Sequence, residues 1–254
     1  MLQLWRKPTL IAITPDGVTI NSGHKARNVI TTKKAFTWQQ VLTGFENNAV
    51  SINAKSVRFI LSNQYVRYAV LPWQAGVFSQ QDWHSLAENH MRSLYGKAID
   101  KWTIQVAMQG YGKPLVVSAI DRELLVRLDS IATQNNWTIE SVEPALMSIT
   151  NHYRNKINKN DWLMISESQY LLLVEIVNGM VMNFSVTMPP ESEISVQARN
   201  LLNRALKSPQ NSELKQLHIF GDLNFPEGDG RLNINKLSKN TDGTTVDSLL
   251  AGLV

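Results

Sequence analysis

The chain of 254 residues contains no cysteine. This absence excludes structural disulfides, thiolate-bound zinc and a cysteine nucleophile, and it fits a reducing compartment. Charged residues are also sparse, at 18%, whereas hydrophobic residues make up 43%, a balance typical of a folded globular protein rather than a disordered one. The length is sufficient for two parts that each bury a core of their own.

Long apolar runs are lacking as well. The most apolar stretch, residues 170–177, is broken by Glu175 and falls far short of the ~20 residues that a membrane-spanning helix needs. The first eight residues have too short an apolar core for a secretory signal, and Leu2 stands where myristoylation requires glycine. We therefore expect a cytoplasmic protein that is not anchored in a membrane by itself.

Familiar signatures of catalytic and metal sites are missing too. The five histidines show no metal-ligand spacing, so we expect no metal site, and His90 is expected to be a core histidine. No Walker A, Gly-x-Ser-x-Gly or Gly-x-Gly-x-x-Gly pattern occurs. The net charge of +4 is scattered, which argues against nucleic acid as a partner. Asp16, Glu167 and Glu175 make a poor carboxylate set for a nuclease.

What the sequence does contain is a repeated order of predicted elements, strand–strand–strand–helix–strand. Thr37 and Gln40 form a capping box for the first of the two helices, and Asn178-Gly179 is a strong hairpin signal in the second copy. The first copy comprises strands 9–13, 18–20 and 28–32, a helix over 38–45 and strand 57–62; the second comprises strands 162–166, 170–177 and 180–187, helix 193–206 and strand 217–220. The repetition predicts two related halves that face each other across a cleft.

Further elements are predicted between and after the two copies. A helix capped by Ser79 and Gly96 carries an apolar stripe that includes Leu94 and Tyr95. A helix capped by Asp121 follows two strands. The additional predicted strands are residues 65–71, 102–108, 114–120 and 137–142, with an edge strand at 231–237.

The duplicated plan resembles that of the ATPase class that includes actin, the sugar kinases and the large heat-shock chaperones. The resemblance implies an α+β protein with α/β-type layers, namely the actin-like ATPase fold with two RNase H-like halves. The predicted first half is residues 1–155, including an inserted small subdomain at about 73–120, and the predicted second half is residues 156–254.

In that class, two hairpin turns with glycines and an aspartate wrap the nucleotide phosphates, and a Gly-Gly turn supports the adenosine. All three turns are degraded in this chain. The first has Thr14 in place of the aspartate, the second has no glycine and contains Glu167, which would repel a phosphate, and the third keeps only Gly221 before Asp222. We regard Thr14, Asp16, Gly17, Glu167 and Gly221 as vestigial positions, and we expect neither a catalytic residue nor ATP with Mg²⁺ as a cofactor.

A more specific resemblance lies in the run Arg58-Phe-Ile-Leu-Ser-Asn-Gln-Tyr-Val-Arg-Tyr-Ala-Val-Leu-Pro-Trp73. It is similar to a stretch in the actin-like proteins of type IV pilus and type II secretion machines, namely PilM, MshI and the cytoplasmic part of GspL. Such proteins lie at the cytoplasmic face of the inner membrane and bind the cytoplasmic tail of a bitopic partner; some also contact an assembly ATPase. We expect this chain to lack the transmembrane helix and periplasmic domain of GspL and to resemble a PilM-type subunit.

The resemblance implies a non-catalytic scaffold or adaptor of the inner-membrane assembly platform. Arg67, Tyr68 and Trp73 lie in the most distinctive motif and are candidate anchors of a groove for a partner peptide. Alternatively, they fill the junction between the core and the inserted subdomain. Two other functions are retained as alternatives: a nucleotide-binding ATPase of the same fold, and a nucleic-acid-binding module with an RNase H-like core.

Overall fold

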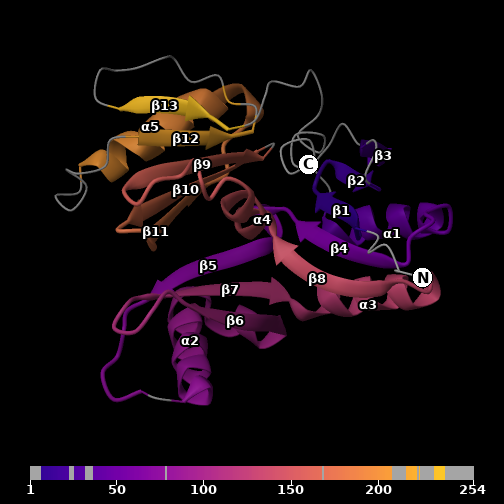
Figure 1. Ribbon diagram of the computed structural model, residues 1–254, viewed down its shortest axis with the longest axis horizontal. Coiled ribbons are helices and arrows are strands. Elements are labelled where there is room, and N and C mark those ends of the chain that lie inside the picture. The colour runs from indigo at the N-terminus through magenta and orange to yellow at the C-terminus, as the bar shows by residue number, and fades with distance from the viewer. Residues whose placement is uncertain are drawn as a thin grey trace, which may run out of the picture. The chain divides into compact units, whose positions relative to one another are not determined.

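The computed structural model describes residues 7–22, 26–31, 37–77, 79–167, 169–207, 216–221, 223 and 232–237. These residues form two five-stranded sheets and one three-stranded sheet (Figure 1). The chain makes two compact units. The first contains the described residues up to Tyr65 together with Leu124–His152, and the second contains Val66–Glu123 and Tyr153–Leu237.

The first unit is built on a mixed sheet of strand order β3-β2-β1-β4-β8. Strands β1 to β3 pair antiparallel, whereas β4 pairs parallel to both β1 and β8. The apolar residues of the helices recur every three or four positions and are buried, as Leu42 and Phe45 of α1 and Leu124 and Leu128 of α3 show. The elements are β1 (Thr9–Thr14), β2 (Gly17–Asn21), β3 (Ala26–Thr31), α1 (Trp38–Ala49), β4 (Ser56–Leu61), α3 (Arg122–Gln134), β8 (Thr138–Pro144) and α4 (Ala145–His152).

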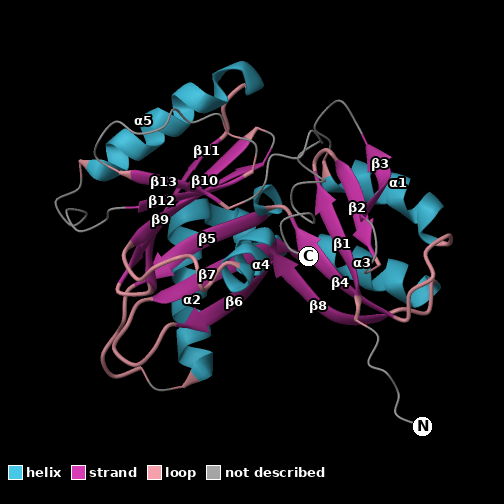
Figure 2. Ribbon diagram, turned by 45° about the horizontal axis from the view of Figure 1, so that its top comes forward, coloured by secondary structure: helices cyan, strands magenta, loops and turns pink. Residues whose placement is uncertain are grey.

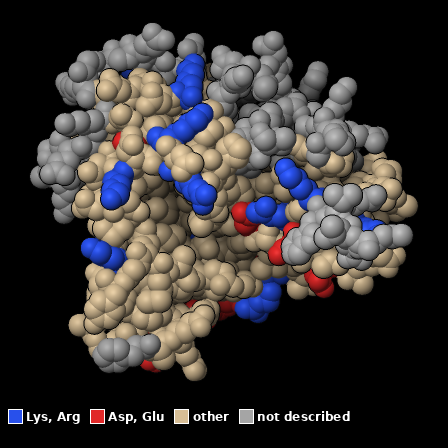
Figure 3. Space-filling model, viewed as in Figure 1, with Lys and Arg blue, Asp and Glu red and all other residues tan. Residues whose placement is uncertain are grey.

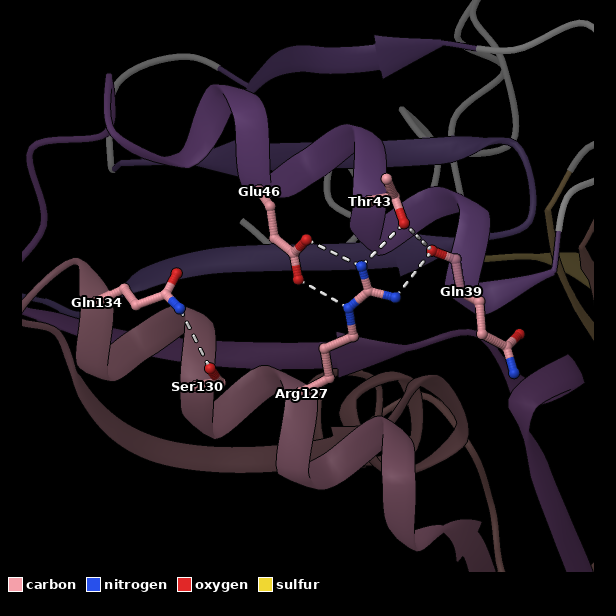
Figure 4. Close-up of polar contacts among 6 residues, drawn as sticks. All are labelled: Gln39, Thr43, Glu46, Arg127, Ser130 and Gln134. Atoms are coloured by element: carbon pink, nitrogen blue, oxygen red, sulfur yellow. Dashed lines mark hydrogen bonds and ion pairs between the residues drawn. The ribbon is translucent and has the colours of Figure 1, made fainter.

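A polar contact joins α1 to α3 (Figure 4). Arg127 of α3 donates two hydrogen bonds to the carboxylate of Glu46 on α1, at 2.7 and 2.9 Å, one to the hydroxyl of Thr43 at 2.8 Å and one to the carbonyl of Gln39 at 3.2 Å. The hydrogen bond from Arg127 lowers the pKa of Glu46, and partial burial opposes that shift. The two helices are therefore joined by a bidentate ion pair.

The second unit contains a sheet with the same topology, of strand order β11-β10-β9-β12-β13. Three antiparallel strands are again followed by a helix and a parallel strand, so the predicted repetition is confirmed. Asn178 and Gly179 both have positive φ, as a two-residue hairpin turn requires. The elements are β9 (Asp161–Glu167), β10 (Tyr170–Val177), β11 (Met180–Thr187), α5 (Ile194–Leu206), β12 (Gln216–Phe220) and β13 (Asn233–Lys236).

The central strands of this second sheet, β9 and β10, are buried on both faces. Trp162 of β9 and Leu217 of β12 belong to the cluster that packs against Leu201 of α5. On β12, His218 is buried as well, and its Nε2 lies 2.7 Å from the carboxylate of Asp161. His218 therefore pairs with a carboxylate. Among the described residues, no group of three or more histidine or acidic side chains could hold a metal ion.

The second unit also contains the three-stranded antiparallel sheet, of strand order β5-β7-β6. Its helix α2 crosses the sheet (Figure 2) and buries Trp83, Ala87 and Met91 against it. Ser79 caps α2 by accepting a hydrogen bond from the Asp82 N–H at 3.0 Å, and Gly96 ends it, as predicted. The elements are β5 (Val66–Leu71), α2 (Gln80–Tyr95), β6 (Trp102–Met108) and β7 (Leu115–Asp121).

The small sheet includes β5 and so takes in residues before the predicted start of the subdomain near Trp73. The predicted half boundaries, 1–155 and 156–254, follow the repeat and stay a prediction. Among the described residues, no helix combines the length and the apolarity needed to span a membrane. Two residues that the sequence analysis named, Leu2 and Asp222, lie outside the described residues.

Candidate functional site

The first hairpin turn, between β1 and β2, uses its polar groups within the hairpin itself. Thr14 is buried, and its hydroxyl donates to the carbonyl of Gly17 at 3.2 Å. Gly17 has a φ of 141° and pairs with Thr14 across the two strands. Pro15, which offers no backbone N–H, is buried in the same turn. The side chain that stands where the ATPase class carries its aspartate is therefore part of the hairpin.

The second hairpin turn, between β9 and β10, places a buried carboxylate where a phosphate would have to bind. Glu167 is 2% exposed and pairs with Tyr170 across the two strands. Burial and then the charge of Glu167 raise the pKa of Tyr170, and the charge of Arg67 opposes this shift. Burial and then Glu167 likewise raise the pKa of Tyr68. Glu167 therefore belongs to a packed cluster with Arg67, Tyr68 and Tyr170.

The third turn follows β12, and a close backbone contact requires its glycine. Gly221 has a φ of 99°, and a Cβ atom at this position would lie 2.1 Å from the carbonyl oxygen of Ser166. Only glycine allows the backbone after β12 to approach β9 so closely. The residues of these turns do not fit Mg²⁺ with ATP, because one turn buries a carboxylate and the other two use their distinctive residues for packing.

The second unit has a pocket of about 690 Å³. We call it the aromatic groove. β5 contributes Tyr68, Ala69 and Val70, and no lining residue is charged. The remaining residues are Pro72 and Trp73 after β5; His90, Leu94 and Tyr95 of α2; Gly112 and Pro114 between β6 and β7; and Met182, Asn183 and Phe184 of β11. The groove is large enough for a peptide segment or a small ligand.

Aromatic contacts hold the groove together. The ring of Tyr68 stacks on Phe184 with centroids 5.1 Å apart. The ring of Trp73 contacts Trp83 at 4.9 Å and Tyr111 at 5.0 Å. Tyr111 is 85% exposed at the tip of its loop. Rings held in this way offer large, rigid apolar surface that costs little conformational entropy on binding.

The structure brings the predicted anchors Tyr68 and Trp73 into one pocket. Arg67 contacts a different set of groups: its guanidinium donates to the carbonyl of Val66 at 3.2 Å and acts on Tyr170. Tyr68 is 8% exposed, so it also fills the junction between β5 and β11, as the alternative interpretation held. A binding role for Arg67, Tyr68 and Trp73 remains a prediction.

Contacts that position the walls of the groove could not be identified from the sequence. Gln109 joins the β6–β7 loop to β11: its side-chain amide donates to the Val181 carbonyl at 2.9 Å and to the Pro114 carbonyl at 3.1 Å, and its side-chain oxygen accepts from the Val181 N–H at 2.7 Å. No local pattern marks such a long-range contact. The sequence also did not indicate that part of the apolar stripe of α2 is exposed, as Leu94 is at 56%.

The expectation for His90 was wrong. It was assigned to the core because it lies on the apolar stripe of α2. In the structure His90 is only partly buried and lines the aromatic groove. The three-stranded sheet covers the side of the helix that carries Trp83, Ala87 and Met91, and His90 lies outside that side.

Charge on the face shown in Figure 3 is distributed in separate groups. The Lys and Arg side chains of the described residues are divided by broad uncharged surface over the region of β5, β7 and α2. The continuous basic stripe that a nucleic-acid-binding module needs is not present among the described residues of this face.

No family model matches the sequence, and no curated protein does. The fold is nevertheless similar to solved structures over nearly the whole chain. The cytoplasmic domain of EpsL, an inner-membrane component of the type II secretion system of Vibrio cholerae, has a TM-score of 0.64 at 9% identity, covering 96% of this chain and 93% of that one. A PilM–PilN type IV pilus biogenesis complex has a TM-score of 0.61 at 9% identity, with coverages of 98% and 99%.

A third structure, a Bacteroides thetaiotaomicron protein with an actin-like ATPase fold and unknown function, has a TM-score of 0.61 at 12% identity, with coverages of 96% and 94%. At these identities the likeness establishes the fold. The chain has the actin-like fold, and the predicted α+β class is confirmed. Two of the three structures come from the secretion and pilus machines that the motif of residues 58–73 indicated.

Proposed function

We propose that this chain is a non-catalytic, actin-like scaffold of the inner-membrane assembly platform of a type IV pilus or type II secretion system. In this role it binds the cytoplasmic segment of a bitopic membrane partner and lies at the cytoplasmic face of the membrane through that partner. The observation that carries the proposal is the uncharged aromatic groove, on a fold similar to the EpsL cytoplasmic domain over 96% of the chain.

The non-catalytic part of the proposal is supported by the turns. Thr14 hydrogen-bonds within its own hairpin, Glu167 is a buried carboxylate, and Gly221 is required by the carbonyl of Ser166. Each of the features that would have to serve a nucleotide thus has a structural role instead. An actin-like ATPase needs backbone donors and a metal-binding carboxylate at these positions.

The binding part of the proposal is supported by exposed apolar surface along the groove. Leu94 is 56% exposed, Met182 39% and Tyr111 85%. Large apolar side chains grouped at a concave site mark a surface that a partner covers. Because the lining carries no charge, the bound part of the partner is expected to be apolar or neutral, with any charged residues outside the groove.

The test is a calorimetric titration of the full chain with synthetic peptides. The peptides are the cytoplasmic segments of the bitopic inner-membrane proteins encoded with pilus or secretion genes in the same genome. We expect one of them to bind, and we expect Leu94→Glu and Met182→Glu each to weaken binding at least about tenfold, because a charge would be buried against apolar groups.

The matched control is Val196→Glu. Val196 lies on α5 of the same unit, is 58% exposed and does not line the groove, so its replacement should leave binding unchanged. Failure of every such peptide to bind, or binding that survives both groove substitutions, would contradict the proposed function. An assembly ATPase, if it is a second partner, should bind elsewhere and be unaffected by these variants.

A further inference from the structure

We infer that the first unit carries a binding site of its own, which takes a small zwitterion of the amino-acid type, with one carboxylate and one ammonium group. The site is a pocket of about 270 Å³ between the sheet of this unit and α4, and we call it the polar pocket. Every described residue that lines it belongs to the first unit, whereas the aromatic groove belongs to the second. The inference is therefore independent of the proposed function.

The polar pocket differs from the aromatic groove in the chemistry of its lining. Of the seven described residues that line it, five are polar or charged, and the two apolar ones are Leu10 and Ile60. Leu10 of β1 is opposite Arg58 of β4 in the register of the two strands, and Ile60 lies two residues further along β4. These three side chains therefore share one face of the sheet, which gives the pocket an apolar surface beside a cation.

The side of α4 that lines the pocket is polar. Ser148, Asn151 and His152 have the i, i+3, i+4 spacing of residues on one helical face. Ser148 is only 8% exposed, and its hydroxyl has no hydrogen-bond partner among the described residues. Buried polar groups in native proteins nearly always have a partner, so this hydroxyl points to a ligand that supplies one.

An ion pair between β4 and β8 supplies both charges of the pocket. Nη2 of Arg58 donates to Oε1 of Glu143, and Nε of Arg58 donates to the hydroxyl of Ser141 at 3.2 Å. The same Oε1 accepts from Ser141 at 3.1 Å, so Oε2 of Glu143 makes no hydrogen bond within the described residues. Nη1 of Arg58 is likewise unused within them. A guanidinium and a carboxylate with spare hydrogen-bonding capacity therefore line the same pocket.

These two side chains select the charge pattern of the ligand. A carboxylate of the ligand would accept from Nη1 of Arg58, and an ammonium group would donate to Oε2 of Glu143. A simple anion such as phosphate would be repelled by Glu143, and a divalent cation would be repelled by Arg58. The volume suits a molecule of roughly nine non-hydrogen atoms, and Leu10 and Ile60 offer its side chain an apolar surface. An amino acid with a short aliphatic side chain has all of these properties.

The first experiment is ligand-observed NMR on the full chain, with each standard amino acid added singly. Saturation transfer from the protein identifies the amino acids that bind, and calorimetric titration measures their affinity. We expect at least one to bind. We expect its amide and its N-acetyl derivative each to bind at least about tenfold more weakly, because each removes one of the two charges and leaves a charged side chain unpaired. Acetate and orthophosphate serve as comparison probes and should not bind at the same concentration.

The location of the site is tested by methyl NMR and by substitutions on α4. The methyl resonances of Leu10 and Ile60 should shift when the amino acid binds. Ser148→Ala and Asn151→Ala should each weaken binding about threefold to tenfold, because each removes one hydrogen-bonding group. Both should fold, since Asn151 is exposed and the hydroxyl of Ser148 has no partner among the described residues. Met147→Ala is the matched control, because Met147 lies on the same helix, is 38% exposed and does not line the pocket.

Absence of saturation transfer to every amino acid at millimolar concentration would overturn the inference. So would binding that tolerates the loss of either charged group, binding of orthophosphate or acetate with equal affinity, or binding that leaves the methyl resonances of Leu10 and Ile60 unchanged. The proposed function fails separately, since its peptide titrations concern the aromatic groove, and Leu94→Glu should leave amino-acid binding unchanged.

Discussion

At the scale of single residues, the positions that a nucleotide-binding actin-like protein would use for phosphate make contacts within this protein. Glu167 is the clearest case: it is a carboxylate only 2% exposed, and together with burial, which is the larger cause, it raises the pKa of Tyr68 and Tyr170. The sequence predicted that Glu167 would repel a phosphate. It could not predict that Tyr68, about a hundred positions earlier, shares its environment, because that contact depends on the fold.

Gly221 provides the first residue-scale prediction. Gly221→Ala should lower the free energy of unfolding by about 2 to 4 kcal/mol, because the new Cβ would lie 2.1 Å from the carbonyl oxygen of Ser166 and φ is 99°. Gly76→Ala is the matched control, with a φ of 89° and no neighbour within 4 Å of its Cβ. The control should cost only about 1 to 2 kcal/mol. Urea unfolding measures both, and equal costs would show that the close approach is absent.

Tyr68 provides the second residue-scale prediction. Burial raises its pKa well above the usual 10, so the folded protein keeps the phenol neutral while the unfolded chain ionises it. The stability contributed by the neutral form is complete below pH 10 and is lost as the pH rises from there toward the folded pKa, at up to ~1.4 kcal/mol per pH unit. Tyr68→Phe should make the alkaline decline of the unfolding free energy shallower by that slope. An unchanged slope would mean that Tyr68 is not buried.

At the scale of elements, local signals predicted well and long-range contacts were missed. The Asn178-Gly179 hairpin and the Ser79 cap were confirmed because their chemistry lies within four residues. By contrast, the start of α4 is capped from a distance: the side-chain oxygen of Asn63 accepts from the N–H of Leu146 at 3.0 Å. No pattern within the sequence of α4 could have indicated this contact.

The residues of the aromatic groove show the same difference between local signals and long-range contacts. Trp73 and Tyr68 were singled out because they lie in one motif, whereas Met182 comes from β11 and has no distinguishing local pattern. The periodicity of α2 predicted an apolar stripe but not where the sheet that covers it would end. Leu94 lies on the predicted apolar stripe, and in the structure it is exposed at the groove.

The contact between α1 and α3 gives the element-scale prediction. A double-mutant cycle of Glu46→Gln and Arg127→Ala should give a coupling of about 0.5 to 1 kcal/mol at neutral pH, modest because both side chains are about one-third exposed. The pKa of Glu46 is lower in the folded protein than its ordinary value of 4.5. The stability from this ion pair is therefore fully present above pH 4.5 and is lost as the pH falls through the lower pKa of the folded state. A coupling that persists at pH 2 would contradict the assignment.

At the scale of the whole molecule, the order of elements was the most informative feature of the sequence. The twice-occurring strand–strand–strand–helix–strand order predicted four strands of each five-stranded sheet, although no family model and no curated protein match the sequence. The solved structures with this fold share only 9 to 12% of its residues. The pattern of buried and exposed positions is therefore retained where the individual residues are not.

The same contrast explains why function is harder to predict than fold. A strand tolerates any apolar residue of suitable size, whereas a phosphate-binding turn needs glycines and an aspartate at fixed positions. Their loss can be seen in the sequence at Thr14 and Glu167. The proposed binding function depends on the groove, whose residues come from β5, α2, β11 and the loops after β5 and β6 of the second unit.

The central claim is that this actin-like chain no longer binds nucleotide, and thermal unfolding with and without millimolar Mg-ATP tests it most directly. A nucleotide-binding actin-like ATPase measured in the same buffer serves as the positive control. A ligand at about 100 times its dissociation constant adds ~2.7 kcal/mol to the free energy of unfolding, which is a shift of a few degrees. We predict no shift with ATP, ADP or GTP, whereas a clear shift would show that the degraded turns still form a working nucleotide site.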